Sequence, residues 1–242
     1  MSIWGKVVGG AAGFALGGPL GALVGAVAGH AVDKMRAAAA PPTGEQRQAA
    51  FSIAVIVLAA KMAKADGVVT RDEIVAFRRI FHVPPHEMRN VGRLFDQAKR
   101  DVAGYELYAR QVARLLADSP RVLEELLDGL FLIAKADGVM HPAELEFLGR
   151  VAAIFGFDQA QFERIAASHM EPEEADPYEV LGLARGGGDD EIRTTYRRLV
   201  REHHPDKLIA QGMPKEFIEV ANGKLASIND AYARIRRERG LK

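Results

Sequence analysis

The stretch REHHPDKL, residues 201–208, decides how the C-terminal part of this chain folds. It ends a basic helical segment, because a proline disfavours helical geometry at the residue before it and fixes its own φ. His204 must therefore leave the helix, and Asp206 follows on a short, stiff corner. We expect this corner to be exposed and its residues to take no part in filling the core.

The segments on both sides of the corner have the periodicity of helices. Residues 189–203, DDEIRTTYRRLVREH, begin with three acids and carry their basic residues later, as the helix macrodipole favours. Their apolar residues Ile192, Tyr196 and Leu199 recur at i, i+4 and i+7 and form a core face. We expect residues 215–238 to form a second long helix, antiparallel to the first. Its core residues would be Phe217, Leu225, Ile228, Tyr232 and Ile235.

A separate basic stripe runs along the first helix, with Arg193, Arg197 and Arg201 at i, i+4 and i+8. The stretch DPYEVLGL (176–183) precedes this helix, and we expect its Tyr178 and Leu181 to face inward. Together with the His-Pro-Asp corner, this order resembles the J domain of DnaJ-type co-chaperones, over about residues 176–242. The resemblance implies binding to a DnaK-type chaperone and stimulation of its ATP hydrolysis. The implied partner-binding residues are His204, Pro205, Asp206, Arg193, Arg197, Arg201 and Lys207.

Other interpretations of the same residues are weaker. His203, His204 and Asp206 include metal-ligating types, but neighbours at a helix end point in different directions. A hydrolytic dyad would lack a nucleophile, since this segment has no cysteine and its serine is distant, at 227. A basic stripe also suits a solvated helix face or a nucleic-acid footprint. The small net charge of the segment argues against nucleic acid.

The middle of the chain contains an internal repeat. MAKADGVVTRDEI (62–74) and IAKADGVMHPAEL (133–145) align, which predicts two similar helical halves packed on each other. No stretch alternates with the period of a strand, so we predict an all-α chain. The repeated turn resembles the TerB family, named for tellurite resistance, over about residues 49–170. This resemblance implies a helical interaction domain.

Each repeated turn carries acids that suit either helix capping or a metal. Asp-Gly can end one helix, and Thr70-x-x-Glu73 forms a capping box for the next. An EF-hand would need more oxygen ligands at alternate positions. Capping is the favoured interpretation, and metal binding stays as the alternative. The candidate metal ligands are Asp66, Glu73, Asp137 and Glu144.

Residues 7–29, VVGGAAGFALGGPLGALVGAVAG, are free of charge and as a helix would span about 34 Å, enough to cross a bilayer. A transmembrane anchor is favoured over a cleaved signal peptide or a flexible glycine-rich tail. Lys34 and Arg36 follow the segment and Lys6 precedes it, which places the bulk of the chain in the cytoplasm. Glycines recur at every fourth position, a pattern that lets two helices approach closely and predicts a homodimer. They are Gly9, Gly13, Gly17, Gly21, Gly25 and Gly29.

Composition narrows the classes of function. Lys and Arg number 32 and Asp and Glu number 32, and this balance argues against a general nucleic-acid binder. The absence of cysteine excludes disulfides, thiol catalysis and cysteine–zinc sites, and suits a reducing compartment. The sequence also lacks the Gly/Phe-rich linker and zinc modules of general DnaJ chaperones. We expect no cofactor and no catalytic activity of its own.

The predicted domains are an anchor at 1–36, a linker at 37–48, a TerB-like domain at 49–170 and a J domain at 171–242. This order looks like that of DjlA-type membrane-anchored co-chaperones of the bacterial inner membrane. The function predicted first is regulation of a DnaK-type chaperone. The alternative is a membrane-tethered interaction or stress-signalling scaffold in which the TerB-like domain carries the main activity.

The glycine stripe gives a first testable prediction. Replacing Gly17 and Gly21 with leucine should weaken association of the segment in a membrane, because the larger side chains keep two helix backbones apart. An in-membrane association assay measures this effect. Equal association of the double variant and the unmodified segment would contradict the prediction.

Overall fold

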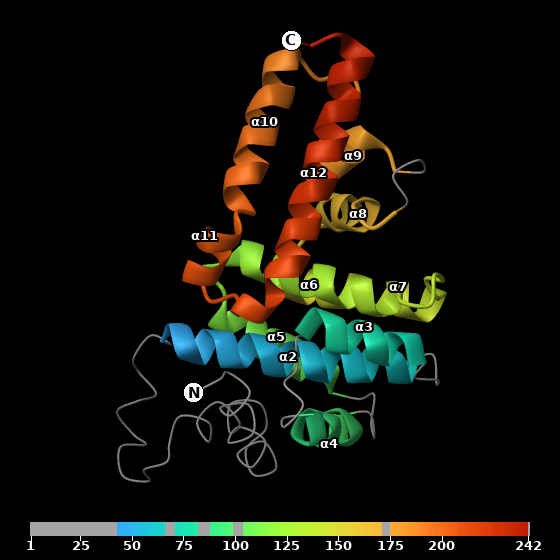
Figure 1. Ribbon diagram of the computed structural model, residues 1–242, viewed down its shortest axis with the longest axis vertical. Helices are drawn as coiled ribbons and strands as arrows, with labels where there is room; N and C mark the ends of the chain where they lie inside the picture. Colours follow the sequence, from blue (N-terminus) through green and yellow to red (C-terminus); the bar gives the residue numbers. More distant parts are fainter. Residues whose placement is uncertain (1–42, 66–70, 82–87, 99–103, 171–174, 242) are drawn as a thin grey trace.

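The computed structural model describes residues 43–65, 71–81, 88–98, 104–170 and 175–241, and within these ranges every regular element is a helix (Figure 1). The prediction of an all-α chain is confirmed. The first helices are α2 (Gly44–Ala65), α3 (Arg71–Phe81), α4 (Met88–Ala98), α5 (Tyr105–Leu115), α6 (Pro120–Ala134) and α7 (Pro142–Phe155). They are followed by α8 (Gln159–Ala167), α9 (Pro177–Leu181), α10 (Asp189–Glu202), α11 (Pro205–Ala210), the 3-10 turn η2 (Lys215–Phe217) and α12 (Ile218–Arg239).

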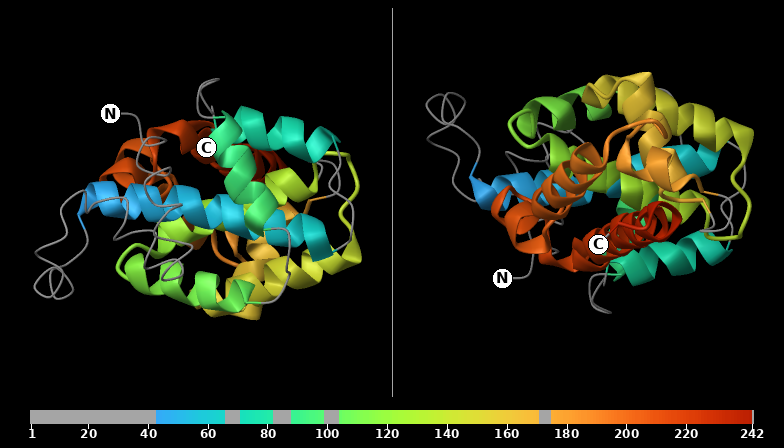
Figure 2. Two further views of the ribbon diagram at one scale, coloured as in Figure 1. Left: turned by 90° about the horizontal axis from the view of Figure 1, so that it is seen from below. Right: turned by 90° about the horizontal axis from the view of Figure 1, so that it is seen from above.

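Helix α2 is the centre of a body formed by helices α2 to α8, which is called the TerB body here because its sequence resembles the TerB family. Residues 51–63 of this helix are all buried, because nearly all of their side chains are apolar and other helices surround them. Helices α4, α5, α6 and α7 all pack against α2, which runs across the middle of the molecule in the view from below (Figure 2). The ammonium of Lys61 is also buried and lies 5.6 Å from the ring centroid of Tyr108.

The internal repeat relates the α2–α3 pair to the α6–α7 pair. In the second copy, Gly138 takes φ = 87° in the turn after α6, a conformation that favours glycine. The next helix begins at Pro142, and the Glu144 carboxylate accepts a hydrogen bond from the His141 N–H at 3.0 Å. The second turn therefore has the capping contact that its sequence predicts.

Helices α10 and α12 form an antiparallel hairpin that stands on the TerB body, with α9 beside it (Figure 1). The rings of Tyr196 and Tyr232 stack with centroids 3.9 Å apart, and the Tyr196 hydroxyl donates to Asn229 Oδ1 at 3.0 Å. The upper part of the hairpin closes a core of its own with α9. Its main buried side chains are Tyr178, Leu181, Ile192, Leu199, Ile228 and Ile235.

The link between the two long helices differs from the expectation of a bare corner. An additional helix, α11, begins at Pro205, and residues 215–217 form a 3-10 turn, so that the second long helix starts at Ile218. Pro205 explains the first difference, because a proline ends one helix and also suits the first position of the next. Pro205 is buried, so the expectation that no corner residue is buried was wrong for this residue.

The corner end of the hairpin shares the apolar core of the TerB body. Leu208, Met213 and Phe217 are almost completely buried in that core. The rings of Phe217 and Phe51 of α2 meet edge to face, with centroids 4.7 Å apart. Phe217 also lies directly against Gly129 of α6, where an added Cβ would come within 2.7 Å of the ring. The hairpin is therefore packed onto the TerB body through apolar contacts.

Several predictions from the sequence fall outside the described residues. These include the glycine stripe from Gly9 to Gly29, the transmembrane span and Asp66. For Glu73, which lies in α3, the structure describes only the backbone. Among the helices that the structure does describe, none combines the length and the apolar character needed to cross a bilayer.

The close approach of Gly129 and Phe217 yields a stability prediction. Gly129→Ala should lower the free energy of unfolding by about 1–3 kcal/mol, because the added methyl overpacks the contact with the ring. The matched control is Gly223→Ala in α12, where a Cβ meets nothing within 4 Å. That change should stabilise by about 0.5–1 kcal/mol through helix propensity. Chemical denaturation followed by circular dichroism measures both, and a stabilising Gly129→Ala would contradict the packing argument.

Candidate functional site

The corner presents two polar side chains to solvent. The side chains of His204 and Asp206 are 55% and 88% exposed. His204 is the N-cap of α11, and its Nδ1 accepts a hydrogen bond from the Asp206 N–H at 3.3 Å. With Nδ1 acting as an acceptor, the neutral imidazole carries its proton on Nε2. The corner thus offers an N–H donor next to an exposed carboxylate.

Exposed basic side chains lie on the two helices that flank this corner. Arg197 and Arg201 lie on successive turns of α10, and Lys207 lies in the first turn of α11; all three are exposed. Within the described part of the chain, none of the three forms an ion pair or a side-chain hydrogen bond. Arg193 is partly buried and donates to Asp190 at 3.3 Å. The predicted partner-binding residues therefore include three available cations beside the corner.

Another flank of α10 faces the TerB body. Glu202 accepts hydrogen bonds from Arg198 at 3.1 Å and is paired with Arg121 of α6 at 2.8 Å. Helix α10 thus has separate surfaces for the TerB body and for solvent. Docking of the hairpin on the TerB body leaves the basic side chains near the corner uncovered.

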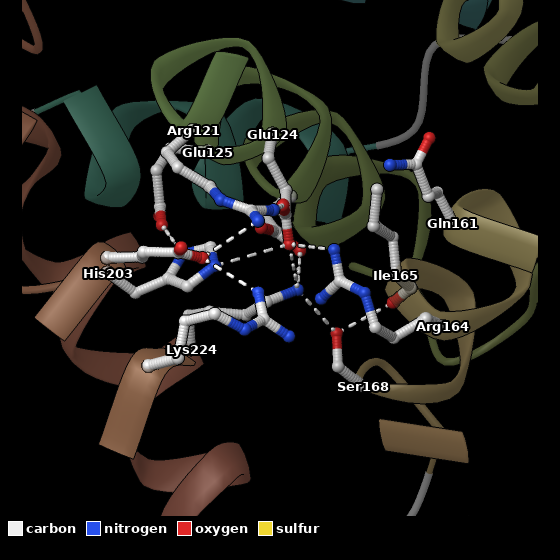
Figure 3. Close-up of polar contacts among 12 residues, drawn as sticks. Arg121, Glu124, Glu125, Gln161, Arg164, Ile165, Ser168, His203 and Lys224 are labelled. Atoms are coloured by element: carbon white, nitrogen blue, oxygen red, sulfur yellow. Dashed lines mark hydrogen bonds and ion pairs between the residues drawn. The ribbon is translucent and has the colours of Figure 1, made fainter. Parts of the chain in front are cut away.

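A group of charged residues lies between the TerB body and the hairpin (Figure 3). We call it the junction cluster, and it consists of Arg121, Glu124, Glu125, Asp128, Arg164, His169, His203 and Lys224. The carboxylates of Glu124, Glu125 and Asp128 project from α6, and these three residues are at most 1% exposed. Buried charges are expensive unless they are paired, and the other helices supply the pairing groups.

Glu124 has the largest number of cationic neighbours in the junction cluster. Its carboxylate lies 2.7 Å from Arg121, 2.8 Å from Arg164 of α8 and 3.3 Å from Lys224 of α12. Burial alone would raise the pKa of this carboxyl, but the cations, Lys224 foremost, hold the pKa well below its ordinary value. Glu124 is therefore a permanent buried anion that attracts groups from two other helices.

Asp128 lies one turn further along α6 and also joins the two parts of the molecule. Its Oδ1 is 3.1 Å from Lys224 Nζ and 2.6 Å from His169 Nε2. Burial opposes ionisation, yet Lys224 and His169 together lower the pKa of Asp128 below its ordinary value. Burial is in turn the main reason that the pKa of His169 is lowered.

His203, the residue before the corner, points into the junction cluster and is completely buried. Its Nδ1 is 2.8 Å from Glu125 Oε1, and its Nε2 is 3.6 Å from Glu124. Burial raises the pKa of Glu125 to about 7, and the nearby charge of Asp128 acts in the same direction. Glu125 is thus the carboxyl of the cluster that can gain or lose a proton near neutral pH.

The metal alternative for the corner finds no support in this geometry. His203 points inward while His204 and Asp206 are exposed, so the three side chains do not converge. In the second repeated turn, Asp137 accepts the Val139 N–H at 3.0 Å, and the carboxylate of Glu144 caps α7. Across the residues described by the structure, no group of three or more His, Asp or Glu side chains is arranged to hold a metal ion.

The junction cluster was not predicted from the sequence. A local signal was present, because LEELLD (123–128) places three acids inside an otherwise apolar helical run. Acids at such positions indicate buried partners elsewhere. The identity of those partners could not be read, since His203 and Lys224 are distant along the chain.

Three family models match successive parts of the chain. Residues 1–48 match the co-chaperone DjlA transmembrane domain, residues 52–167 match tellurite resistance protein TerB, and residues 176–238 match the DnaJ domain. A TerB body with a C-terminal J domain and an N-terminal segment of this kind defines a class of J-domain co-chaperones.

Curated relatives extend this likeness to the whole chain. The protein named co-chaperone protein DjlA of Photobacterium profundum is 32% identical over 279 residues, covering 99% of this chain and 100% of the relative. That of Vibrio cholerae is 33% identical and covers 100% of both chains, and that of Coxiella burnetii is 31% identical and covers 98% of both. The chain belongs to the DjlA co-chaperone family. No solved structure matches it.

Because the pKa of Glu125 is raised, the effect of Glu125→Gln on the free energy of unfolding should depend on pH. Between its ordinary pKa of 4.5 and the folded value of about 7, the folded state keeps a proton that the unfolded state has lost. Raising the pH through this window therefore destabilises the wild type, and glutamine escapes this cost. The free energy of unfolding of Glu125→Gln relative to wild type should rise by about 1–3 kcal/mol between pH 5 and pH 8.

Denaturant unfolding at several pH values tests this expectation. The exposed Glu163→Gln in α8 is the matched control, since it makes the same chemical change outside the junction cluster. A difference between Glu125→Gln and wild type that stays constant from pH 5 to pH 8 would contradict the expected burial effect.

Proposed function

We propose that this protein is a co-chaperone that binds a DnaK-type chaperone through its J domain and stimulates ATP hydrolysis by that chaperone. The observation that carries the proposal is the exposed His204–Asp206 corner beside three unpaired cations, Arg197, Arg201 and Lys207. Membership of the DjlA co-chaperone family and the match to the DnaJ domain support it. The protein contributes no catalytic group and acts on the ATPase of its partner.

The geometry divides the work between two features. The cations attract an acidic surface of the partner, which raises the rate of encounter and sets the orientation. The corner then presents the Nε2 donor of His204 and the Asp206 carboxylate from a backbone already fixed by Pro205 and α11. Little conformational entropy remains to be lost on binding, which favours a productive contact.

The proposal also includes a location and an assembly state. A single N-terminal span in the bacterial inner membrane would hold the TerB body and the J domain in the cytoplasm, where a DnaK-type chaperone is available. The match of residues 1–48 to the DjlA transmembrane domain supports the anchor, and the charges around the glycine-rich segment support the orientation. The glycine stripe would pair two copies through their anchors.

One observation favours the scaffold as a second candidate function. A cavity of about 340 Å³ opens among α2, α3, α4 and α6, lined mainly by apolar side chains. Arg78 and Asp96 add charged groups to its lining. In that case the TerB body would bind a ligand or a partner of its own, and the J domain would recruit the chaperone to it.

Single-turnover ATP hydrolysis by a DnaK-type chaperone, with the full-length chain in detergent micelles, tests the co-chaperone proposal. His204→Gln and Asp206→Asn should each return hydrolysis to the unstimulated rate. His204→Gln should cost at most about 1 kcal/mol of stability, because it removes only a long N-cap hydrogen bond. Charge reversal at Arg197 and Arg201 should weaken binding most at low salt, where screening is least.

The matched control is His141→Gln, the same substitution at another helix N-cap, in the TerB body. It should leave stimulation unchanged. Full stimulation by a folded His204→Gln chain would exclude the proposed role of the corner. The scaffold would then become the better candidate.

A further inference from the structure

The residues on both sides of the exposed corner are buried in contact with the TerB body. His203, directly before the corner, and Leu208, shortly after it, are both 0% exposed. His203 enters the junction cluster, and Leu208 enters the apolar core around α2 and α6. The exposed residues His204 and Asp206 thus sit on a very short bridge between two fixed points. Their position is set by the TerB body as well as by the hairpin.

Of these two buried residues, His203 makes the polar contact, and a hydrogen bond depends on direction. His203 Nδ1 lies 2.8 Å from Glu125 Oε1, and within the described residues its other ring nitrogen has no hydrogen-bond partner. Glu125 Oε2 likewise has none. This one hydrogen bond therefore joins the two side chains, and its loss would leave a buried polar group on each side of the interface without it.

The second helix of the hairpin is fixed to the same helix of the TerB body. Lys224 of α12 reaches Asp128 at 3.1 Å and Glu124 at 3.3 Å. Because Glu125 and Asp128 lie three residues apart, they occupy adjacent turns of α6. Helix α6 therefore holds α10 through His203 and α12 through Lys224 (Figure 3). A displacement of α6 would move the base of the hairpin with it.

We infer that His203 is a positioning residue for the J domain: its buried contact with Glu125 lets the TerB body set the orientation of the corner toward the partner chaperone. This inference rests on the proposed function. It goes further by making the TerB body part of the machinery that stimulates the ATPase. His203 does not touch the partner and acts only through the placement of His204 and Asp206.

The test separates binding from stimulation in single-turnover hydrolysis with the full-length chain in detergent. His203→Leu fills a similar volume without a hydrogen-bonding group for Glu125. It should lower the maximal stimulated rate about fivefold or more, because small misplacements of a reacting geometry are costly. The concentration for half-maximal stimulation should change less than about twofold, since Arg197 and Arg201 still provide docking. His203→Asn keeps a hydrogen-bonding amide near the place of Nδ1 and should restore most of the rate.

Two further variants control for stability. His169→Gln alters a histidine of the same cluster that contacts Asp128 within the TerB body and makes no contact with Glu125; stimulation should stay as in wild type. If His203→Leu alone does not fold, His203→Leu/Glu125→Leu replaces both partners by apolar groups, which is tolerated better. The folded double variant should still stimulate poorly, because apolar contacts do not fix the direction of the corner.

Wild-type stimulation by a folded His203→Leu or double variant would overturn the inference, as would an equal loss in His169→Gln. Failure of the proposed function looks different. In that case the wild-type chain would not stimulate hydrolysis, or His204→Gln would stimulate as well as wild type. If stimulation needs His204 but not His203, the proposed function stands and only the role of the TerB body is excluded.

Discussion

The rest of the structure depends on the burial of three carboxylates on α6. Glu124, Glu125 and Asp128 project into a region without solvent, and an unpaired anion there would cost several kcal/mol. Helices α8, α10 and α12 supply the groups that neutralise or hydrogen-bond them. Apolar contacts such as Phe217 against Gly129 provide attraction between the hairpin and the TerB body. The charges add direction, because His203 must lie beside Glu125, and Lys224 beside Glu124 and Asp128, for these buried acids to be paired.

Helix α10 shows how one amphipathic segment serves three neighbours. Ile192 and Leu199 face the core that it shares with α9 and α12, and Arg198 and Glu202 form its flank toward Arg121 of the TerB body. Arg197 and Arg201 remain exposed on the half of the helix nearer the corner. The proposed surface for the chaperone is what remains after the other two faces are buried. Docking of the hairpin and binding of a partner are therefore compatible.

Much of the fold could be predicted because its signals are local. Helical periodicity, the His-Pro-Asp corner and the capping acid Glu144 can each be read within a few residues. Helix α11 differs from the expected bare corner because Pro205 not only ends one helix but also favours the first position of the next. The junction cluster was missed for a different reason. Glu125 and His203 are 78 residues apart, and no local pattern specifies which buried acid meets which base.

A buried ionic cluster is a weak source of stability, and its stronger effect is on specificity of arrangement. In this chain that effect falls on the corner, which lies between His203 and Leu208, both held by the TerB body. The sequence has no Gly/Phe-rich segment that would let the J domain move freely. Instead the hairpin is attached directly to α6, so a molecule bound to the TerB body would be held at a fixed distance and orientation from a chaperone bound at the proposed surface. In this arrangement the distance between the two partners is set by packing, whereas a flexible linker would leave it variable.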